Sequence, residues 1–555
     1  MKKFSKAWIL LMMLVLVLSI GLSSSFAATA KDKETGLPYM ANYKKPVTFT
    51  VFVRDPGLVP AKTNPVLKKI TQLTGVTINY EFLVGDLNEK IGVMIAGEDY
   101  PDAIFCGDAN TKFIDAGAFI PLETRLKKYS NLNALYSPFA KYMTSKDGHI
   151  YSLELYNVST TTPIFENGGS GFFMQKAVIE ENGYKIPHTI DDYFEMIENY
   201  KAKHPTIDGV KTIGFEILCD GWRDFCLRNP AQHLMGAGND GDVYVNPKTY
   251  VASFYQITDT AKTYYKKLNE EFHKGIIEPE TFTESYDQYI SRLSTGAVLG
   301  MFDQYWDFRY TAENVLKSDK KFNRTYVSVP IANPGVKDGY LDAPNGIIPG
   351  INGIGITKKC KNPERLLEFF DWLLRRDVQD YLQWGIEGKD FKKVGKNDKV
   401  LTQARREITR DTAKQRDLTG NTLWTYSPKQ QGLYADGSPC GPLDSAAEYK
   451  ASQSEYDIGF LTALKINYPA QLLSPPVKRA AYYPVWAMPI ADGSPAKVAN
   501  TAMNDVLRKY YPRLIMVKPD EYDGLWEKFL VDFKASNPQP YLDEVNRLIK
   551  ERMGK

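Results

Sequence analysis

The chain has 555 residues, of which 43% are hydrophobic and 24% charged, a composition typical of a globular protein too large for one ordinary core. Its formal net charge of +3 equals the three lysines of its first 30 residues, so the rest of the chain carries 66 basic and 66 acidic side chains. A neutral chain has no electrostatic reason to bind nucleic acid or an anionic membrane, and we expect neither as a partner.

Residues 1–30 have the pattern of a secretory signal peptide. A basic start with three lysines precedes an apolar run over 7–22, and small-x-Ala cleavage patterns end at Ala27 and Ala30. No later segment is long and apolar enough to predict a membrane span. The sequence therefore predicts a secreted protein.

Strand and helix patterns alternate from the start of the predicted mature chain. Strand-like runs occupy 47–53, 76–82 and 102–106, and amphipathic helix patterns lie between them at 64–74 and 87–96. This β-α-β-α-β order predicts a mostly parallel sheet.

The alternation resumes after long connections in the middle of the chain. Strand patterns recur at 171–174, 213–218, 297–302 and 324–330; 353–391 is typical of a strand followed by two helices, and 498–553 is helical. Such interruptions favour two α/β lobes joined by several crossings over two domains on one linker. The cleft between two such lobes is a favoured ligand site.

Four stretches carry a resemblance to a known family. They are GFFMQKAVIEENGYKIPHTIDDYFEMI (171–197), FHKGIIEPETFT (272–283), GAVLGMFDQYWDF (296–308) and NPERLLEFFDWLLRRDVQDYLQWGIEGKDF (362–391). In order and spacing they resemble the extracellular solute-binding proteins of family 1, the carbohydrate-binding receptors of ABC importers. Within it the chain is most similar to the large Gram-positive oligosaccharide-binding lipoproteins and the alginate-binding proteins.

The resemblance implies a two-lobed, periplasmic-binding-protein-like α/β fold of the class II type, with lobes discontinuous in sequence and a helical C-terminal tail. We expect an N-terminal lobe of 46–158 plus 284–335, a C-terminal lobe of 159–283 plus 336–500, and a helical segment over 501–555. Crossings between the lobes are expected near 155–165, 280–286 and 330–350.

Two departures from the family pattern lead to further expectations. The first cysteine is Cys106, so no lipobox follows the signal and lipid anchoring is not expected; the protein would lie outside the cell membrane, or in the periplasm of a Gram-negative source. The alginate-binding relatives carry an acidic calcium loop where this chain has 204–211. That segment contains the single acid Asp208, too few oxygen ligands for calcium, so we expect neither a metal nor a cofactor.

Aromatic side chains near strand ends are the first candidates for sugar contacts. Trp222 and Trp306 each follow a predicted strand, and strand-to-helix junctions face the cleft in open α/β sheets. Trp424 and Trp486 lie among tyrosines and prolines in irregular regions and are further candidates. Trp384 opens a Trp-Gly-Ile-Glu-Gly turn and is a weaker one.

Polar side chains beside these positions complete the predicted site. Some flank the two tryptophans, others follow the first and third predicted strands, and one lies in the Trp-Gly-Ile-Glu-Gly turn, where it could instead hold the loop. They are Asp303, Gln304, Arg223, Asp108, Asn110, Arg54, Asp55 and Glu387.

Other functions and pairings remain open at this point. A secreted glycoside hydrolase or lyase would need two carboxylates about 5–10 Å apart, and Asp303 with Asp307 has the necessary residue types. A surface carbohydrate sensor or adhesin on the same fold is a third alternative. Cys219 and Cys226 are close enough in sequence to pair. We expect a non-enzymatic, monomeric receptor for an oligosaccharide that also contacts the membrane permease subunits of an ABC importer.

Overall fold

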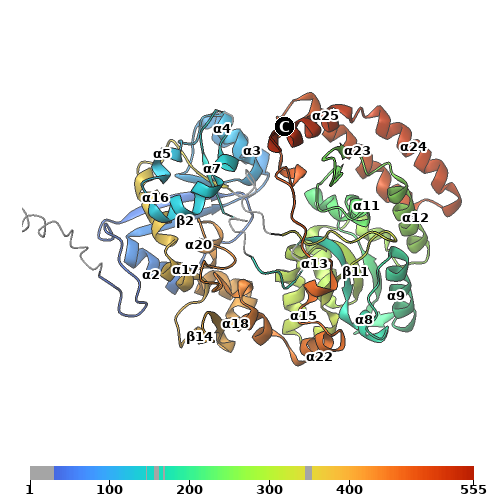
Figure 1. Cartoon of the computed structure of the whole chain (residues 1–555), viewed down its shortest axis with the longest axis horizontal. Helices are drawn as coiled ribbons and strands as arrows, with labels where there is room; N and C mark the ends of the chain where they lie inside the picture. Colours follow the sequence, from blue (N-terminus) through green and yellow to red (C-terminus); the bar gives the residue numbers. More distant parts are fainter. Residues whose placement is uncertain (1–29, 146, 156–161, 167–168, 344–352, 555) are drawn as a thin grey trace, which may run out of the picture.

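The computed structural model describes residues 30–145, 147–155, 162–166, 169–343 and 353–554, so nearly all of the expected signal peptide lies outside the described residues. These residues form two lobes, each built on its own sheet, with the C-terminal helices on the second (Figure 1). No helix in this part of the chain combines the length and apolar character needed to cross a bilayer.

The first lobe is built on a five-stranded sheet in the order β2-β1-β3-β13-β4. β1 pairs in parallel with β2 and β3, which confirms the predicted β-α-β-α-β start, whereas β13 pairs antiparallel with β3 and β4. The strands are β1 (Val47–Val53), β2 (Val76–Phe82), β3 (Ala103–Phe105), β4 (Ser152–Glu154) and β13 (Gly353–Ile356).

Helix α2 (Pro65–Thr74) shows how local sequence sets the ends of these elements. Asn64 caps it by accepting hydrogen bonds from the amides of Val66 and Leu67, and a proline occupies the first helical position. The helix ends at Gly75, whose φ of 71° is left-handed; a Cβ there would lie 2.4 Å from a backbone oxygen. Only glycine fits this stop.

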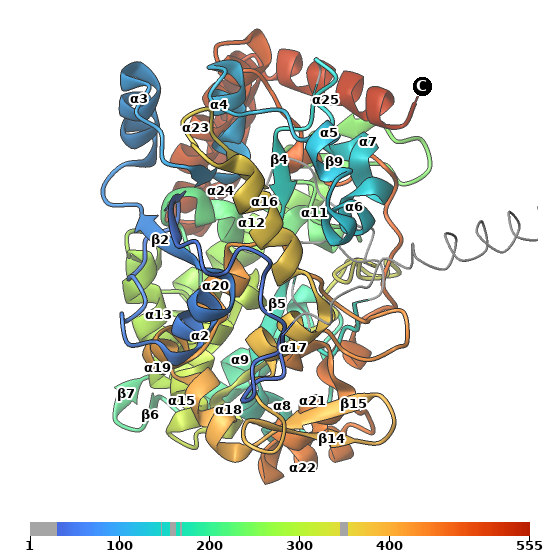
Figure 2. The same cartoon turned by 90° about the vertical axis from the view of Figure 1, so that its left-hand side faces the viewer.

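Helices cover this sheet on the outside of the lobe. α16 (Pro363–Leu373) and α17 (Arg376–Gln383) run across the face seen in Figure 2, and their apolar residues join the core under β1 and β3. Further helices of this lobe are α3 (Leu87–Gly97), α4 (Asn110–Asp115), α5 (Glu123–Leu126), α6 (Ser130–Tyr136), α7 (Ala140–Met143), α19 (Thr412–Leu418) and α20 (Asn421–Thr425).

The second lobe has a four-stranded sheet in the order β12-β5-β11-β8. β11 pairs antiparallel with β5 and parallel with β8. The strands are β5 (Ser170–Gln175), β8 (Ile213–Glu216), β11 (Val298–Gln304) and β12 (Tyr326–Val329), covered by α8 (Lys176–Glu181), α9 (Ile190–Lys203), α12 (Asp259–His273) and α13 (Tyr286–Thr295).

This pairing corrects the predicted division of the chain. Residues 284–335 were expected in the first lobe, but β11 and β12 pair with β5 in the second sheet, and β13 pairs with β3 in the first. Hydrophobic patterning shows that a strand is buried but not which sheet receives its hydrogen bonds. The lobes are therefore discontinuous as expected, with different segments.

The chain crosses between the lobes three times within the topology described. It passes from β4 to β5, from β12 to β13, and from α20, in the first core, to α22 (Glu455–Ala463), in the second. The expected crossings near 155–165 and 330–350 fall on the first two, although 156–161 and 344–352 lie outside the described residues. The crossing near 280–286 is wrong, because the strands on both sides of it, β8 and β11, belong to the second sheet.

The predicted helical tail is confirmed as three helices that pack on the second lobe (Figure 1). Tyr265 of α12 stacks on Tyr511 with centroids 4.0 Å apart, and Asn269 of the same helix donates to the carbonyl oxygens that end the first tail helix. The helices are α23 (Pro495–Met516), α24 (Tyr522–Ala535) and α25 (Gln539–Arg552). The tail is thus an integral part of this core.

Candidate ligand-binding site between the lobes

Trp222 and Trp306 lie together at one edge of the second sheet. Trp222 is in the short helix η3 (Gly221–Asp224) after β8, and Trp306 is in α14 (Tyr305–Phe308) after β11. Because β8 and β11 are parallel neighbours, both residues emerge at the carboxyl edge. Their indole rings are 14° from parallel, 6.0 Å apart between centroids, and 60% and 39% exposed. We call this pair the aromatic platform.

Gln304 fixes the orientation of one of the two rings. The indole nitrogen of Trp306 donates a hydrogen bond to Oε1 of Gln304 at 2.6 Å. Gln304 is the last residue of β11, so the rigid strand sets the position of the amide and through it the ring. Gln304 and Trp306, both predicted to belong to the ligand site, are thus in direct contact.

Arg223 lies between two rings beside the aromatic platform. The centre of its guanidinium is 4.6 Å from the ring centroid of Trp222 and 3.8 Å from that of Tyr286. Its Nε donates to Oδ1 of Asp307 at 3.1 Å, and the Tyr286 hydroxyl donates to the Asp307 carbonyl oxygen at 2.6 Å. Sequence reasoning did not assign Tyr286 to the site, because nothing in the pattern brings the start of α13 to α14.

Asp303 lies beneath the aromatic platform. It is fully buried, and its carboxylate accepts hydrogen bonds from the Tyr289 hydroxyl and from the backbone amide of Gln304, both at 2.6 Å. Burial, with the neighbouring Asp307 carboxylate, raises the pKa of Asp303 to about 8. The expectation that Asp303 touches ligand is corrected, because its burial gives a ligand no access to the carboxylate.

The first lobe brings polar and aromatic groups to the carboxyl ends of its parallel strands. Arg54 and Asp55 directly follow β1, with Arg54 Nε 3.8 Å from Asp55 Oδ1 and the Tyr426 hydroxyl 3.4 Å from Asp55 Oδ2. The Tyr426 ring packs against Phe105, at the end of β3, and Phe82, at the end of β2. Asp55 is half exposed, so it remains a candidate for ligand contact.

Asn110 is a structural residue in this arrangement. It is buried, and its side-chain amide donates to the Gly353 carbonyl oxygen at 2.6 Å, which ties the start of α4 to β13. The predicted contact of Asn110 with ligand is therefore corrected. Asp108 precedes it in a short helix, and its side chain lies outside the described structure.

Trp486 is half exposed on the second lobe. It is 48% exposed, in the short helix η9 (Val485–Ala487) of the second lobe. Six residues later, Asp492 forms an ion pair with Lys112 of α4 at 3.5 Å, which joins the two lobes. Trp486 thus remains a candidate for ligand contact, as an exposed ring on the second lobe.

The model of the family described as "Bacterial extracellular solute-binding protein" matches residues 56–380 of this chain, which is more than half of its length. The chain belongs to this family.

Two curated relatives of this solute-binding protein are named for the sugars they bind. It is 26% identical over 413 residues to the fructooligosaccharide ABC transporter substrate-binding protein FusA of Streptococcus pneumoniae serotype 4, covering 70% of this chain and 72% of the relative. It is 22% identical over 357 residues to the polygalacturonan/rhamnogalacturonan-binding protein YtcQ of Bacillus subtilis, covering 62% and 66%.

Solved structures share the fold at lower identity. S. pneumoniae FusA in complex with kestose superposes with a TM-score of 0.64 and 20% identity, covering 92% of this chain and 100% of that one. The alginate-binding protein AlgQ2 without calcium ion superposes with a TM-score of 0.59 and 17% identity, covering 91% and 98%. These likenesses confirm the two-lobed solute-binding fold.

Two other predicted ligand contacts of the solute-binding protein, Trp424 and Glu387, lie in the first lobe. Trp424 is half buried in the first lobe, two residues before Tyr426, and its carbonyl oxygen accepts a hydrogen bond from Lys429. Glu387 is exposed but pairs with Lys393 at 2.7 Å beside the hairpin of β14 (Phe391–Val394) and β15 (Asp398–Leu401), at the lower outer part of the first lobe in Figure 1. Glu387 is thus engaged by a neighbouring lysine.

The Trp-Gly-Ile-Glu-Gly turn is structural in this protein. Trp384 is fully buried against Phe391 and Leu401, and Asp390 accepts a hydrogen bond from the Ile386 amide at 2.9 Å. Gly385 has a φ of 87°, and a Cβ there would clash with Asp390. The motif closes a tight loop and does not present its tryptophan.

Residues 204–211, which we expected to lack a calcium site, include a small hairpin of β6 (Thr206–Ile207) and β7 (Val210–Lys211). Asp208 at its turn pairs with Lys321 at 2.9 Å. Among the described residues, no three His, Cys, Asp or Glu side chains are grouped to hold a metal. The five cysteines, all within the described chain, are free thiols, so Cys219 and Cys226 are not bonded to one another.

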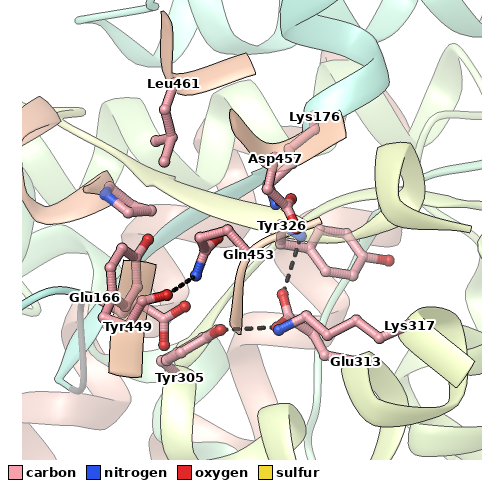
Figure 3. Close-up of a pocket in the computed structure, with 11 residues that line it drawn as sticks. Glu166, Lys176, Tyr305, Glu313, Lys317, Tyr326, Tyr449, Gln453, Asp457 and Leu461 are labelled. Carbon is pink, nitrogen blue, oxygen red and sulfur yellow. Dashed lines mark hydrogen bonds and ion pairs between the residues drawn. The ribbon is translucent and has the colours of Figure 1, made fainter. Parts of the chain in front are cut away.

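A second polar cluster lies beside the crossings and is too small for a sugar. Its cavity holds about 20 Å³ and is lined by residues of two crossings and of the second lobe. Figure 3 shows Glu313 accepting hydrogen bonds from the Tyr305 hydroxyl and the Tyr326 amide, and Lys176 pairs with Asp457 at 2.6 Å. This cluster joins the last crossing to the second lobe.

Proposed function

We propose that this protein is secreted as a monomer, captures an oligosaccharide between its two lobes, and delivers it to the membrane subunits of an ABC importer. The observation that supports this most directly is the aromatic platform, with two exposed and nearly parallel indoles at the edge of the second sheet. The names of the curated relatives support the same ligand class.

The chemistry of the site suits a sugar. Indole faces pack against the apolar C–H faces of pyranose or furanose rings, and exposed aromatic area of this kind is otherwise costly in water. Arg223 and Gln304 on one lobe and Asp55 on the other supply donors and acceptors for hydroxyl groups.

Binding between lobes also gives a signal for delivery. A ligand that contacts both lobes favours the closed arrangement by as much as its affinity differs between open and closed states. Lys112 and Asp492 form an ion pair between the lobes at 3.5 Å, and their side chains are 38% and 66% exposed. Such an exposed pair is weak enough to rearrange. Membrane subunits that recognise the closed arrangement would then select loaded receptors.

Titration calorimetry against a panel of plant and bacterial oligosaccharides tests this proposal. We expect one class to bind with a micromolar or lower Kd without product formation, as judged by chromatography of the ligand afterwards. Trp222→Ala should weaken binding at least about tenfold, whereas Trp222→Phe, which keeps a flat ring, should lose less. Turnover of any oligosaccharide would show a glycoside hydrolase or lyase instead.

A further inference from the structure

We infer that the ligand is an uncharged oligosaccharide, and that Asp307 sets this preference by neutralising Arg223 beside the aromatic platform. The inference rests on the proposed function and narrows its ligand class. The relatives do not decide the question, because one is named for fructooligosaccharides and another for polygalacturonan and rhamnogalacturonan.

The ion pair between Arg223 and Asp307 is held from the inside of the lobe. The Asp307 side chain is 1% exposed, whereas that of Arg223 is 23% exposed, and their Nε and Oδ1 atoms are 3.1 Å apart. A buried carboxylate that loses its cationic partner is strongly destabilising, so the pair resists separation. Arg223 therefore carries hydrogen-bond donors at the partly exposed surface beside the aromatic platform, without a net positive charge.

Two aromatic rings also lie against the Arg223 guanidinium. Trp222 and Tyr286 lie on it at 4.6 and 3.8 Å. An incoming carboxylate prefers the edge of a guanidinium, where two parallel N–H groups bind it bidentately. Asp307 takes the Nε position of one such edge. A uronate would therefore be left with the Nη1–Nη2 edge, beside a buried carboxylate that already balances the charge of Arg223. A sugar hydroxyl needs only one of the remaining N–H groups.

Two further arginines that follow strands or helices of the candidate site also lie beside carboxylates. Arg309, which follows α14, is 3.1 Å from Glu166 and stacks on the exposed ring of Tyr310. On the other lobe Arg54 is 3.8 Å from Asp55. Together with Arg223 and Asp307, these groups sum to zero charge. A charged sugar would bring an uncompensated negative charge next to three carboxylates, which disfavours it over a neutral one.

The test compares neutral with acidic ligands on the full-length mature protein. Calorimetry would use fructo-, xylo- and manno-oligosaccharides in one arm and oligogalacturonates and alginate oligosaccharides in the other, each at 20 and 200 mM NaCl. We expect a neutral ligand to bind with a Kd that changes less than about twofold with salt, and the acidic ligands to bind at least about 100-fold more weakly.

Two variants test the role of the paired carboxylates. Asp307→Asn should raise the affinity for oligogalacturonate relative to the neutral ligand at least about tenfold, with a dependence on salt that the wild type lacks. Glu166→Gln, which frees Arg309 from its partner, should shift the same ratio in the same direction even if the first variant folds poorly. Circular dichroism and thermal unfolding would confirm the fold of each.

Three results would count against the inference. Salt-sensitive, tight binding of a uronate oligosaccharide by the wild type, lost in Arg223→Gln, would overturn it while supporting the proposed function. An unchanged affinity ratio in both carboxylate variants would overturn the role of charge pairing. Binding of no oligosaccharide at all would overturn the proposed function and the inference with it.

Discussion

The hydroxyl of Tyr289 donates a hydrogen bond to Oδ2 of Asp303 at 2.6 Å, in the interior of the second lobe directly under the aromatic platform. Both side chains are fully buried. Asp303 is therefore a buried carboxyl group. It accepts a hydrogen bond from the backbone amide of Gln304, and the side chain of Gln304 orients Trp306. Its protonation state is consequently linked to the stability of the lobe.

We expect this link to make the protein less stable as pH rises. The folded-state pKa of Asp303, about 8, is above the ordinary value of 3.8, so the folded state binds more protons than the unfolded state between these values. Stability from this group is complete below about pH 3.8 and is lost as pH rises through about 8. Asp303→Asn, which is neutral throughout, should gain more than about 1 kcal/mol over wild type between pH 5 and 9.

Urea unfolding followed by circular dichroism at several pH values would measure this difference. The exposed variant Glu387→Gln is the matched control, because its carboxylate pairs at the surface with Lys393, and it should follow the wild type. A constant difference between Asp303→Asn and wild type across the whole pH range would contradict the expectation.

Gln304 should act on the ligand through Trp306. The Gln304 amide oxygen accepts the indole N–H at 2.6 Å, so removing the amide leaves the ring free to turn. We expect Gln304→Ala to weaken binding of the identified sugar about 3- to 10-fold and Trp306→Ala to weaken it about 10- to 100-fold. In the Trp306→Ala background, Gln304→Ala should cost little more.

A double-mutant cycle by calorimetry gives the coupling directly. Additive losses would show that Gln304 contacts the sugar by itself. The difference in tryptophan fluorescence between each protein with and without Trp306 supplies a second readout. An indole that turns freely contacts other neighbours than one held by the Gln304 amide, so Gln304→Ala should change this difference.

The sequence predicted where the strands and helices lie better than it predicted which lobe each strand joins. The cap at Asn64, the stop at Gly75 and the platform tryptophans are local features, set by residues next to each other in sequence. Which sheet receives 298–304 is not local, because it depends on backbone partners more than 100 residues away in β5. The hydrophobic pattern predicted that this strand is buried, but it did not identify the strand with which it pairs.

The candidate site divides in the same way. Strand-end reasoning placed Trp222, Arg223, Gln304 and Trp306 near one another, and the structure brings them together. Their contact with ligand stays a prediction. The same reasoning failed for Asp303, because alternation along a strand that is buried on both faces does not mark which side chain reaches the surface. It also missed Tyr286, which reaches the site from a helix start with no strand beside it in sequence.

Trp384 should matter for stability and not for binding. It is fully buried with Phe391 and Leu401, away from the aromatic platform. Trp384→Ala should lower the free energy of unfolding by about 3–5 kcal/mol, the cost of a large buried cavity, while the folded fraction keeps its Kd for sugar. Denaturant unfolding and calorimetry at low temperature would check both; a Kd weakened more than about threefold would place Trp384 in the ligand site after all.

The buried pair of Lys176 and Asp457 should hold the last crossing to the second lobe. The two groups are 2.6 Å apart and at most 10% exposed, and although burial opposes ionisation, Lys176 keeps the pKa of Asp457 below its ordinary value. Removing one partner leaves the other charge buried and unpaired, so Asp457→Asn should cost about 3–5 kcal/mol. The double variant Lys176→Met with Asp457→Leu, which removes both charges, should be less destabilised than Asp457→Asn alone. Thermal unfolding of the three proteins, with limited proteolysis near 455, would test this order. Equal losses of stability in the single and double variants would show that lost packing, and not the unpaired charge, sets the cost.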